Sequence, residues 1–126
     1  MERILIADDS IDNADMMQTV LSCEGFFTKV LNTGTNLIQE VKEYRPSLVI
    51  LDIMFGDFDG RVLAKSIRNT VELCNIKLVL ISAGFTSDKK EEIQCDCCDA
   101  FIAKPFNIDN FVETVKGLVF YDTSEN

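Results

Sequence analysis

Acidic residues follow two apolar segments of the sequence. The segment RILIA is followed by Asp8 and Asp9, and SLVIL is followed by Asp52. If these carboxylates lie together, each pair at about 4 Å costs on the order of 4 kcal/mol at an effective dielectric near 20. One carboxyl group would then take up a proton, unless a divalent cation neutralised the charges. Because a partly solvated site of carboxylate oxygens suits Mg2+ best, the sequence predicts a Mg2+ site at Asp8, Asp9 and Asp52.

Two more polar residues stand at the ends of apolar segments. Ser82 closes IKLVLIS, and Lys104 follows DAFIA. The ammonium group of Lys104 can pair with a carboxylate at rest and with a phosphoryl oxygen when one arrives. Together with Mg2+ and the Ser82 hydroxyl, it would stabilise the oxygens of a phosphoryl group during transfer. A central carboxylate can act as the nucleophile and become an aspartyl phosphate, and Asp52 is the candidate.

The elements that must position these residues alternate between short apolar runs and amphipathic segments. The pattern predicts strands over 3–8, 26–32, 47–53, 76–82 and 99–103, and helices over 11–24, 36–43, 60–70 and 88–97. Gly25 should end the first helix, the second should end before Arg45-Pro46, and the strand 26–32 alternates as an edge strand does. The helix over 88–97 offers little to a core and should be loosely held. A last helix is expected to bury one stripe, made of Ile108, Phe111, Val112, Val115, Leu118 and Val119.

Five strand and helix pairs of this size predict a single-domain α/β fold, a doubly wound (βα)5 parallel sheet of flavodoxin-like type. Such sheets have the strand order 2-1-3-4-5 and hold ligands beyond the carboxyl ends of their strands. All those ends lie at one edge, so Asp8, Asp9, Asp52, Ser82 and Lys104 should meet in one crevice. We expect one domain over residues 1–121 and a frayed tail over 122–126.

Composition narrows the function classes. The 126-residue chain is 47% hydrophobic, carries a net charge of −9 and has no histidine. Its few basic residues are scattered along the sequence, which argues against binding to nucleic acid or to an anionic membrane. Neither a signal peptide nor a membrane span is present, so a cytoplasmic protein is expected.

The chain also contains five cysteines, an odd number at irregular spacing, which do not form a disulfide framework. The CDCC cluster, which contains Cys95, Cys97 and Cys98, could bind zinc, but it lacks a second ligand pair. Ordinary small cysteines are the favoured interpretation.

With these residues in place, the chain resembles the receiver domain of bacterial two-component response regulators along almost its whole length. The motifs on which this resemblance rests are LIADDS, LVILDIMFGDFDG, LVLISA and AFIAKPF, in the family's order and spacing. The resemblance implies that Asp52 accepts a phosphoryl group from a phosphohistidine on a sensor histidine kinase or a histidine phosphotransfer protein. It implies that Asp8, Asp9, Asp52 and the main-chain carbonyl of Met54 hold Mg2+, and that Ser82 and Lys104 bind phosphoryl oxygens.

The resemblance also implies an output. Ser82 would move toward the phosphate and Phe101 would turn inward, which changes the surface of the fourth helix, fifth strand and fifth helix for a downstream protein effector. It further implies a cis bond between Lys104 and Pro105. Gly56 departs from the family, which usually has proline there, and Cys97 and Cys98 replace frequent glycine and alanine. Met54 and Gly84 would flank the phosphate and could set its lifetime.

The sequence fits three other functions less well. The motif DFDG resembles the Asp-x-Asp motif of haloacid-dehalogenase-like phosphatases, in which Asp57 and Asp59 would act, but Asp57 lies several residues beyond the apolar run. Asp59 also has a structural role available as the cap of the next helix. A receiver-like binding module that works without phosphorylation would not need the clustered acids. Flavin binding would need a phosphate-cradling loop after the first strand, and the sequence there does not provide one.

The leading prediction is therefore a stand-alone, monomeric phosphoacceptor that acts on no substrate but itself.

Overall fold

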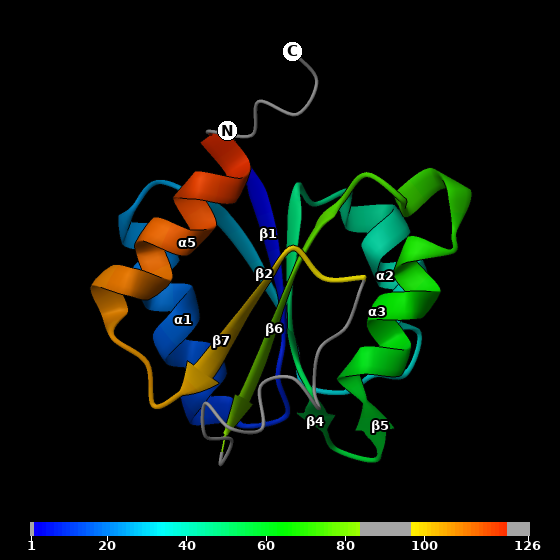
Figure 1. Ribbon diagram of the computed structural model, residues 1–126, viewed down its shortest axis with the longest axis horizontal. Coiled ribbons are helices and arrows are strands. Elements are labelled where there is room, and N and C mark those ends of the chain that lie inside the picture. Colours follow the sequence, from blue (N-terminus) through cyan, green and yellow to red (C-terminus); the bar gives the residue numbers. More distant parts are fainter. Residues whose placement is uncertain (1, 84–96, 121–126) are drawn as a thin grey trace.

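A five-stranded parallel sheet forms the centre of the molecule (Figure 1). The computed structural model describes residues 2–83 and 97–120. The sheet strands are β1 (Arg3–Ala7), β2 (Phe27–Leu31), β3 (Leu48–Asp52), β6 (Lys77–Ala83) and β7 (Ala100–Lys104). Their order is β2-β1-β3-β6-β7, which is 2-1-3-4-5 when these strands are counted along the chain. The predicted doubly wound α/β fold is confirmed, and the alternating strand β2 lies at an edge.

Helices cover both faces of the sheet (Figure 1). Helices α1 (Ile11–Cys23) and α5 (Ile108–Phe120) lie on one face, and α2 (Leu37–Tyr44) and α3 (Gly60–Arg68) lie on the other. Neighbouring residues of a strand therefore enter different cores: Ile4 and Ile6 pack with the first pair of helices, Leu5 and Ala7 with the second. Strands buried on both faces read as continuous apolar runs, which is why they were predictable. The helix predicted over 88–97 falls almost wholly outside the described residues, as does the tail over 122–126.

Local chemistry sets the ends of the helices as predicted. Helix α1 begins after Ser10, whose hydroxyl accepts the N–H of Asn13 at 3.4 Å, and the chain turns at Gly25 with φ +97°. Helix α2 ends at Tyr44, and Arg45 follows with φ +54°. The guanidinium group of Arg3 donates to the carbonyls of Tyr44 and Arg45 at 2.8 and 2.7 Å, which satisfies acceptors that a helix end leaves open.

Three features differ from the sequence-based expectation. A small antiparallel hairpin, β4 (Met54–Phe55) paired with β5 (Phe58–Asp59), occupies the loop after β3, where no strand was predicted. A short 3-10 helix, Val71–Leu73, also precedes β6. The expectation that Ile108 is buried is wrong: it is the first residue of α5 and is 48% exposed, because a terminal residue has helix neighbours on one side only.

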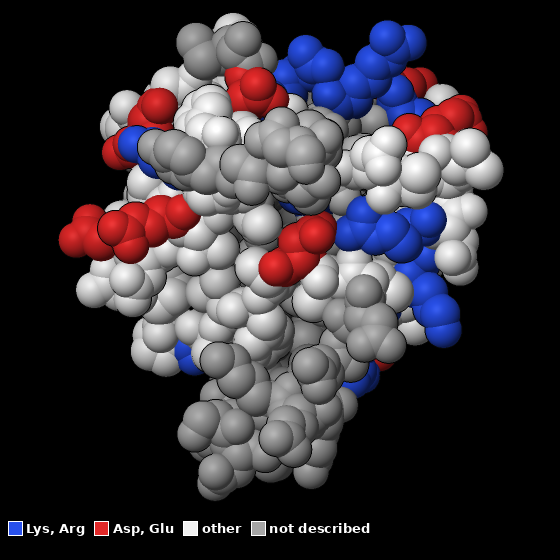
Figure 2. Space-filling view, turned by 45° about the horizontal axis from the view of Figure 1, so that its top comes forward, with Lys and Arg blue, Asp and Glu red and all other residues white. Residues whose placement is uncertain are grey.

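Basic side chains gather on the side of the molecule that carries α2 and α3, to the right in Figure 2. This differs from the scattered distribution that the sequence indicates, since the fold brings distant residues together. Two cations of α3 are paired with carboxylates: Arg68 with Asp99 at 3.0 Å and Arg61 with Asp59 at 2.8 Å. Among the described residues, no helix is both long and apolar enough to cross a bilayer.

Candidate functional site

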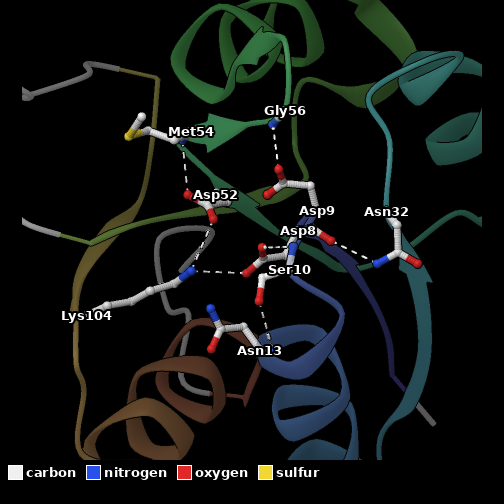
Figure 3. A network of polar contacts seen from close by, with 9 residues as sticks. All are labelled: Asp8, Asp9, Ser10, Asn13, Asn32, Asp52, Met54, Gly56 and Lys104. Atoms are coloured by element: carbon white, nitrogen blue, oxygen red, sulfur yellow. Dashed lines mark hydrogen bonds and ion pairs between the residues drawn. The ribbon is translucent and has the colours of Figure 1, made fainter.

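Three carboxylates converge at the carboxyl ends of β1 and β3. Asp8 and Asp9 follow β1, and Asp52 is the last residue of β3, the neighbouring strand. One carboxylate oxygen from each lies within 4.8 Å of the other two. Asp8 is 1% exposed and Asp52 is 7% exposed, whereas Asp9 lies open to solvent. The predicted convergence of these acids is thus present in the structure (Figure 3).

Lys104 joins the cluster from the far end of the sequence. As the last residue of β7, it reaches across so that its Nζ lies 3.2 Å from Asp8 Oδ2 and 3.1 Å from Asp52 Oδ2 (Figure 3). Its side chain is only 12% exposed. One ammonium group therefore separates two nearly buried carboxylates and neutralises part of their charge.

Burial and the neighbouring charges have opposing effects on the pKa values of Asp52 and Lys104. Burial raises the pKa of Asp52, the hydrogen bond from Lys104 opposes this, and the nearby charge of Asp8 raises the pKa again. Burial alone would lower the pKa of Lys104, but its hydrogen bonds and charge interactions with Asp52 and Asp8 together outweigh burial and raise it. The lysine is therefore held in its charged form, while Asp52 binds a proton more tightly than an ordinary aspartate does.

Backbone groups fix the orientation of each carboxylate. The N–H of Ser10 donates to Asp8 Oδ1 at 2.9 Å, and the N–H of Met54 donates to Asp52 Oδ1 at 3.0 Å. The N–H of Gly56 donates to Asp9 Oδ2 at 3.1 Å. Two of these donors belong to the turn region and first strand of the β4–β5 hairpin, so the hairpin contacts the site directly.

The donor set fits a hard divalent cation. Three carboxylates supply only oxygen ligands, and Asp9 is open to solvent, so water can complete the shell as Mg2+ prefers. The backbone of Met54 adjoins Asp52 through its N–H, and its side chain is 69% exposed beside the cluster. The role of the Met54 carbonyl as a ligand stays a prediction.

The remaining predicted residues lie close by in the sheet. Ser82 of β6 is fully buried and stands one position beyond Ile81, the residue that pairs with Asp52. Phe101 of β7 is half-buried and packs against the core on the α2–α3 face. The peptide bond between Lys104 and Pro105 is cis. Gly84, predicted to flank the phosphate, lies outside the described residues.

The other acids of the hairpin are separate from this cluster. Asp59 caps α3, accepting the N–H of Arg61 at 2.8 Å and pairing with its guanidinium group, which lowers the pKa of Asp59. Asp57 lies exposed in the turn. The capping role predicted for Asp59 is confirmed, and this geometry does not favour the phosphatase alternative. Cys97 and Cys98 are half-buried and pack against the core, and Cys95 falls outside the described residues.

Two contributors were not found by reasoning from the sequence. The Asn32 side chain donates to the carbonyl of Asp8 at 2.9 Å, and the Gly56 N–H binds Asp9. Asn32 follows β2 at the same sheet edge as Asp8, so the strand-end rule could have found it. Gly56 acts through its backbone, which residue type does not reveal.

Comparison with known proteins gives consistent similarities. The family model described as the response regulator receiver domain matches residues 4–116. Among curated proteins, the polar-differentiation response regulator DivK of Brucella anthropi is 26% identical over 113 residues, which cover 90% of this chain and 92% of that protein.

Solved structures have the same fold. The response regulator TrrA of Thermotoga maritima, solved in complex with Mg2+-BeF, has a TM-score of 0.81 at 27% identity, covering 94% of this chain and 99% of that one. A CheY-like receiver domain from Methanospirillum hungatei has a TM-score of 0.86 at 23% identity, covering 100% and 99%, and shows similarity of fold alone.

Proposed function

Because the chain belongs to the response regulator receiver domain family, we propose that it is a phosphoacceptor switch that carries a phosphoryl group on Asp52. The donor is a phosphohistidine on a sensor histidine kinase or a histidine phosphotransfer protein. The observation that carries this proposal is the cluster of Asp8, Asp9 and Asp52 bridged by Lys104. An isolated aspartate at a strand end would be explained by turn formation, but such a cluster is not.

The chemistry follows from the positions of these groups. A carboxylate oxygen of Asp52 attacks phosphorus, the bond from phosphorus to the histidine nitrogen breaks, and the imidazole leaves with that electron pair and takes up a proton. When bound, Mg2+ would supply positive charge opposite the phosphoryl oxygens. Asp8, Asp9, Asp52 and the Met54 carbonyl are its proposed ligands.

Lys104 and Ser82 serve the phosphoryl oxygens. Lys104 Nζ already lies 3.1 Å from Asp52 Oδ2, so it can turn from the carboxylate to an oxygen of the arriving group. Ser82, next to the residue that pairs with Asp52, offers a hydroxyl as donor. At rest Lys104 pairs with both Asp8 and Asp52. Phosphorylation would therefore replace its contact with the Asp52 carboxylate by a contact with a phosphoryl oxygen.

The output surface is proposed to include β7 and α5. A hollow of about 430 Å³ lies between them, lined by both apolar and polar residues, among them Phe106, Phe111 and Asn110. Phe101 is half-buried at rest, so an inward turn when Ser82 moves would bury more of its ring. A downstream protein effector, or the next protein of a phosphorelay, would read this change. We propose that the switch is a monomer.

The direct test is phosphorylation by a small donor. The protein is incubated with acetyl phosphate or phosphoramidate and Mg2+, and intact mass is measured. The wild type is expected to gain one phosphoryl group, and Asp52→Ala none. Asp57→Ala, which changes an exposed aspartate in the nearby turn, is the matched control and should be phosphorylated as the wild type is.

Two results would contradict the proposal: no mass gain in the wild type, or equal gain in Asp52→Ala. Omission of Mg2+ should abolish the gain, and Lys104→Met should strongly reduce it. Beryllofluoride with Mg2+ is the stable mimic for partner studies. Binding of an effector only in its presence would support the proposed output.

A further inference from the structure

The turn of the β4–β5 hairpin touches the candidate metal site at one atom. Gly56 stands in the turn between Phe55 and Phe58, and its N–H donates to Asp9 Oδ2 at 3.1 Å. Of the three clustered acids, Asp9 is the one exposed to solvent. Figure 3 shows its side chain directed at Gly56, while Lys104 bridges the other two carboxylates.

The conformation of Gly56 makes this contact possible. Its φ is +61°, a region that glycine enters without strain. Proline has φ near −65° and no N–H, so at this position it could supply neither the turn nor the hydrogen bond. The contact therefore depends on a residue that keeps its N–H at a positive φ.

The hairpin is itself firmly placed. Phe55 is fully buried, and the Phe58 ring lies so close to Gly34 that a Cβ there would meet its Cδ2 at 2.7 Å. At the base of the hairpin, the Gly60 N–H donates to the Ile53 carbonyl at 2.7 Å. A donor on a fixed backbone can hold an exposed carboxylate that would otherwise sample several rotamers.

We propose that Gly56 is a positioning residue for the metal site: its N–H holds the Asp9 carboxylate toward Asp8 and Asp52 and so raises the affinity for Mg2+. This inference rests on the proposed function, since it assumes that these acids bind the metal. The Oδ2 atom of Asp9 stays hydrogen-bonded to the Gly56 N–H, and its Oδ1 atom is the proposed metal ligand. Ordering the exposed ligand beforehand removes part of the entropic cost of binding.

The first measurement is the Mg2+ dissociation constant by titration calorimetry for the wild type, Gly56→Pro and Gly56→Asn. Asparagine tolerates positive φ and keeps the N–H, and a Cβ at this position would meet only Asp9 Oδ2, at 3.8 Å. Gly56→Pro is expected to weaken binding about threefold to tenfold, the range that corresponds to the net contribution of one ordinary hydrogen bond. Gly56→Asn should stay within about twofold of the wild type.

The second measurement needs neither metal nor a variant of Gly56. Hydrogen exchange of the Gly56 amide is followed by NMR in the metal-free wild type and in Asp9→Ala, and loss of the acceptor should accelerate exchange about threefold or more. Unchanged exchange would overturn the inference, as would equal Mg2+ affinities for the wild type and Gly56→Pro, or equal weakening by proline and asparagine. If Gly56→Pro does not fold, as circular dichroism would reveal, the amide result decides.

These outcomes separate the inference from the proposed function. A wild type that shows no saturable Mg2+ binding would refute the proposed function and this inference with it. A wild type that binds Mg2+ while Gly56→Pro binds equally well would refute only the role of Gly56.

Discussion

Replacing Lys104 with methionine removes a positive charge that lies between two nearly buried acids. Methionine keeps a similar length, so the change is chiefly electrostatic. The ammonium group lies 3.1 Å from Asp52 Oδ2 and 3.2 Å from Asp8 Oδ2. The side chains of Asp52 and Asp8 are 9% and 1% exposed, so water cannot readily replace it.

The magnitude can be worked from these distances. At an effective dielectric of about 20, a charge pair at about 3.1 Å attracts with roughly 5 kcal/mol. Most of this is offset, because the substitution also removes the desolvation cost of the lysine and lets Asp52 take up a proton. We expect the free energy of unfolding to fall by about 1 to 3 kcal/mol at pH 7 without metal.

The sign of the pH dependence follows from the pKa of Asp52. Burial already raises it in the wild type, and loss of the lysine raises it further. A carboxyl group whose folded-state pKa is raised loses stabilisation as pH rises through that pKa, because the folded state must release a proton it prefers to keep. The deficit of Lys104→Met should therefore shrink between pH 7 and pH 5.

Urea unfolding followed by far-ultraviolet circular dichroism is the assay, since the chain has no tryptophan. Mg2+ should stabilise Lys104→Met more than the wild type, because the metal replaces the missing charge. Lys116→Met is the matched control: Lys116 pairs with Glu24 at 2.5 Å at the surface, and its loss should cost less than about 0.5 kcal/mol. Equal costs for the two variants, or a deficit independent of Mg2+, would refute the reasoning.

Three further predictions concern stability. Asp52→Asn should raise the free energy of unfolding of the metal-free protein by up to about 1 kcal/mol at pH 7, since burial disfavours the charged carboxylate, and thermal melts should show this gain shrinking at lower pH. Gly60→Ala should lower the free energy of unfolding, measured in urea, by about 3 kcal/mol or more, because its Cβ would collide with the Asp52 carbonyl. Gly117→Ala in α5 should raise it by up to about 1 kcal/mol, because a Cβ at that position would meet nothing within 4 Å. Arg68→Lys should cost about 1.5 to 3 kcal/mol and lower the melting temperature, because lysine cannot reproduce the fork that binds the carbonyls of Cys97, Cys74 and Ile76; an unchanged melting temperature would contradict this.

The strands and the acidic cluster were predictable because one physical rule governs both. Strands buried on two faces must be apolar throughout, so the first polar residue after an apolar run indicates where the strand leaves the core. The carboxyl ends of parallel strands lie at one edge of the sheet. Lys104 and Asp8, which are 96 positions apart in the sequence, therefore lie together at that edge.

The β4–β5 hairpin was not predictable by the same means. Each of its strands has two residues, fewer than a period-two pattern needs in order to be recognised. Its contacts with the site are made by backbone N–H groups, at Met54 and Gly56, which every residue except proline possesses. The exposure of Ile108 has a related cause, since periodicity describes the middle of a helix better than its ends.

The position of Lys104 on the edge strand β7 bears on how the protein folds. Until β7 docks beside β6, Asp8 and Asp52 have no ammonium group between them and repel each other at the sheet edge. Docking of the last strand completes the hydrogen-bonded sheet and relieves that repulsion in the same step. Docking of β7, the last strand in the sequence, thus reduces the repulsion between Asp8 and Asp52, which lie at the ends of earlier strands. This contact links the two ends of the chain in one cooperative unit.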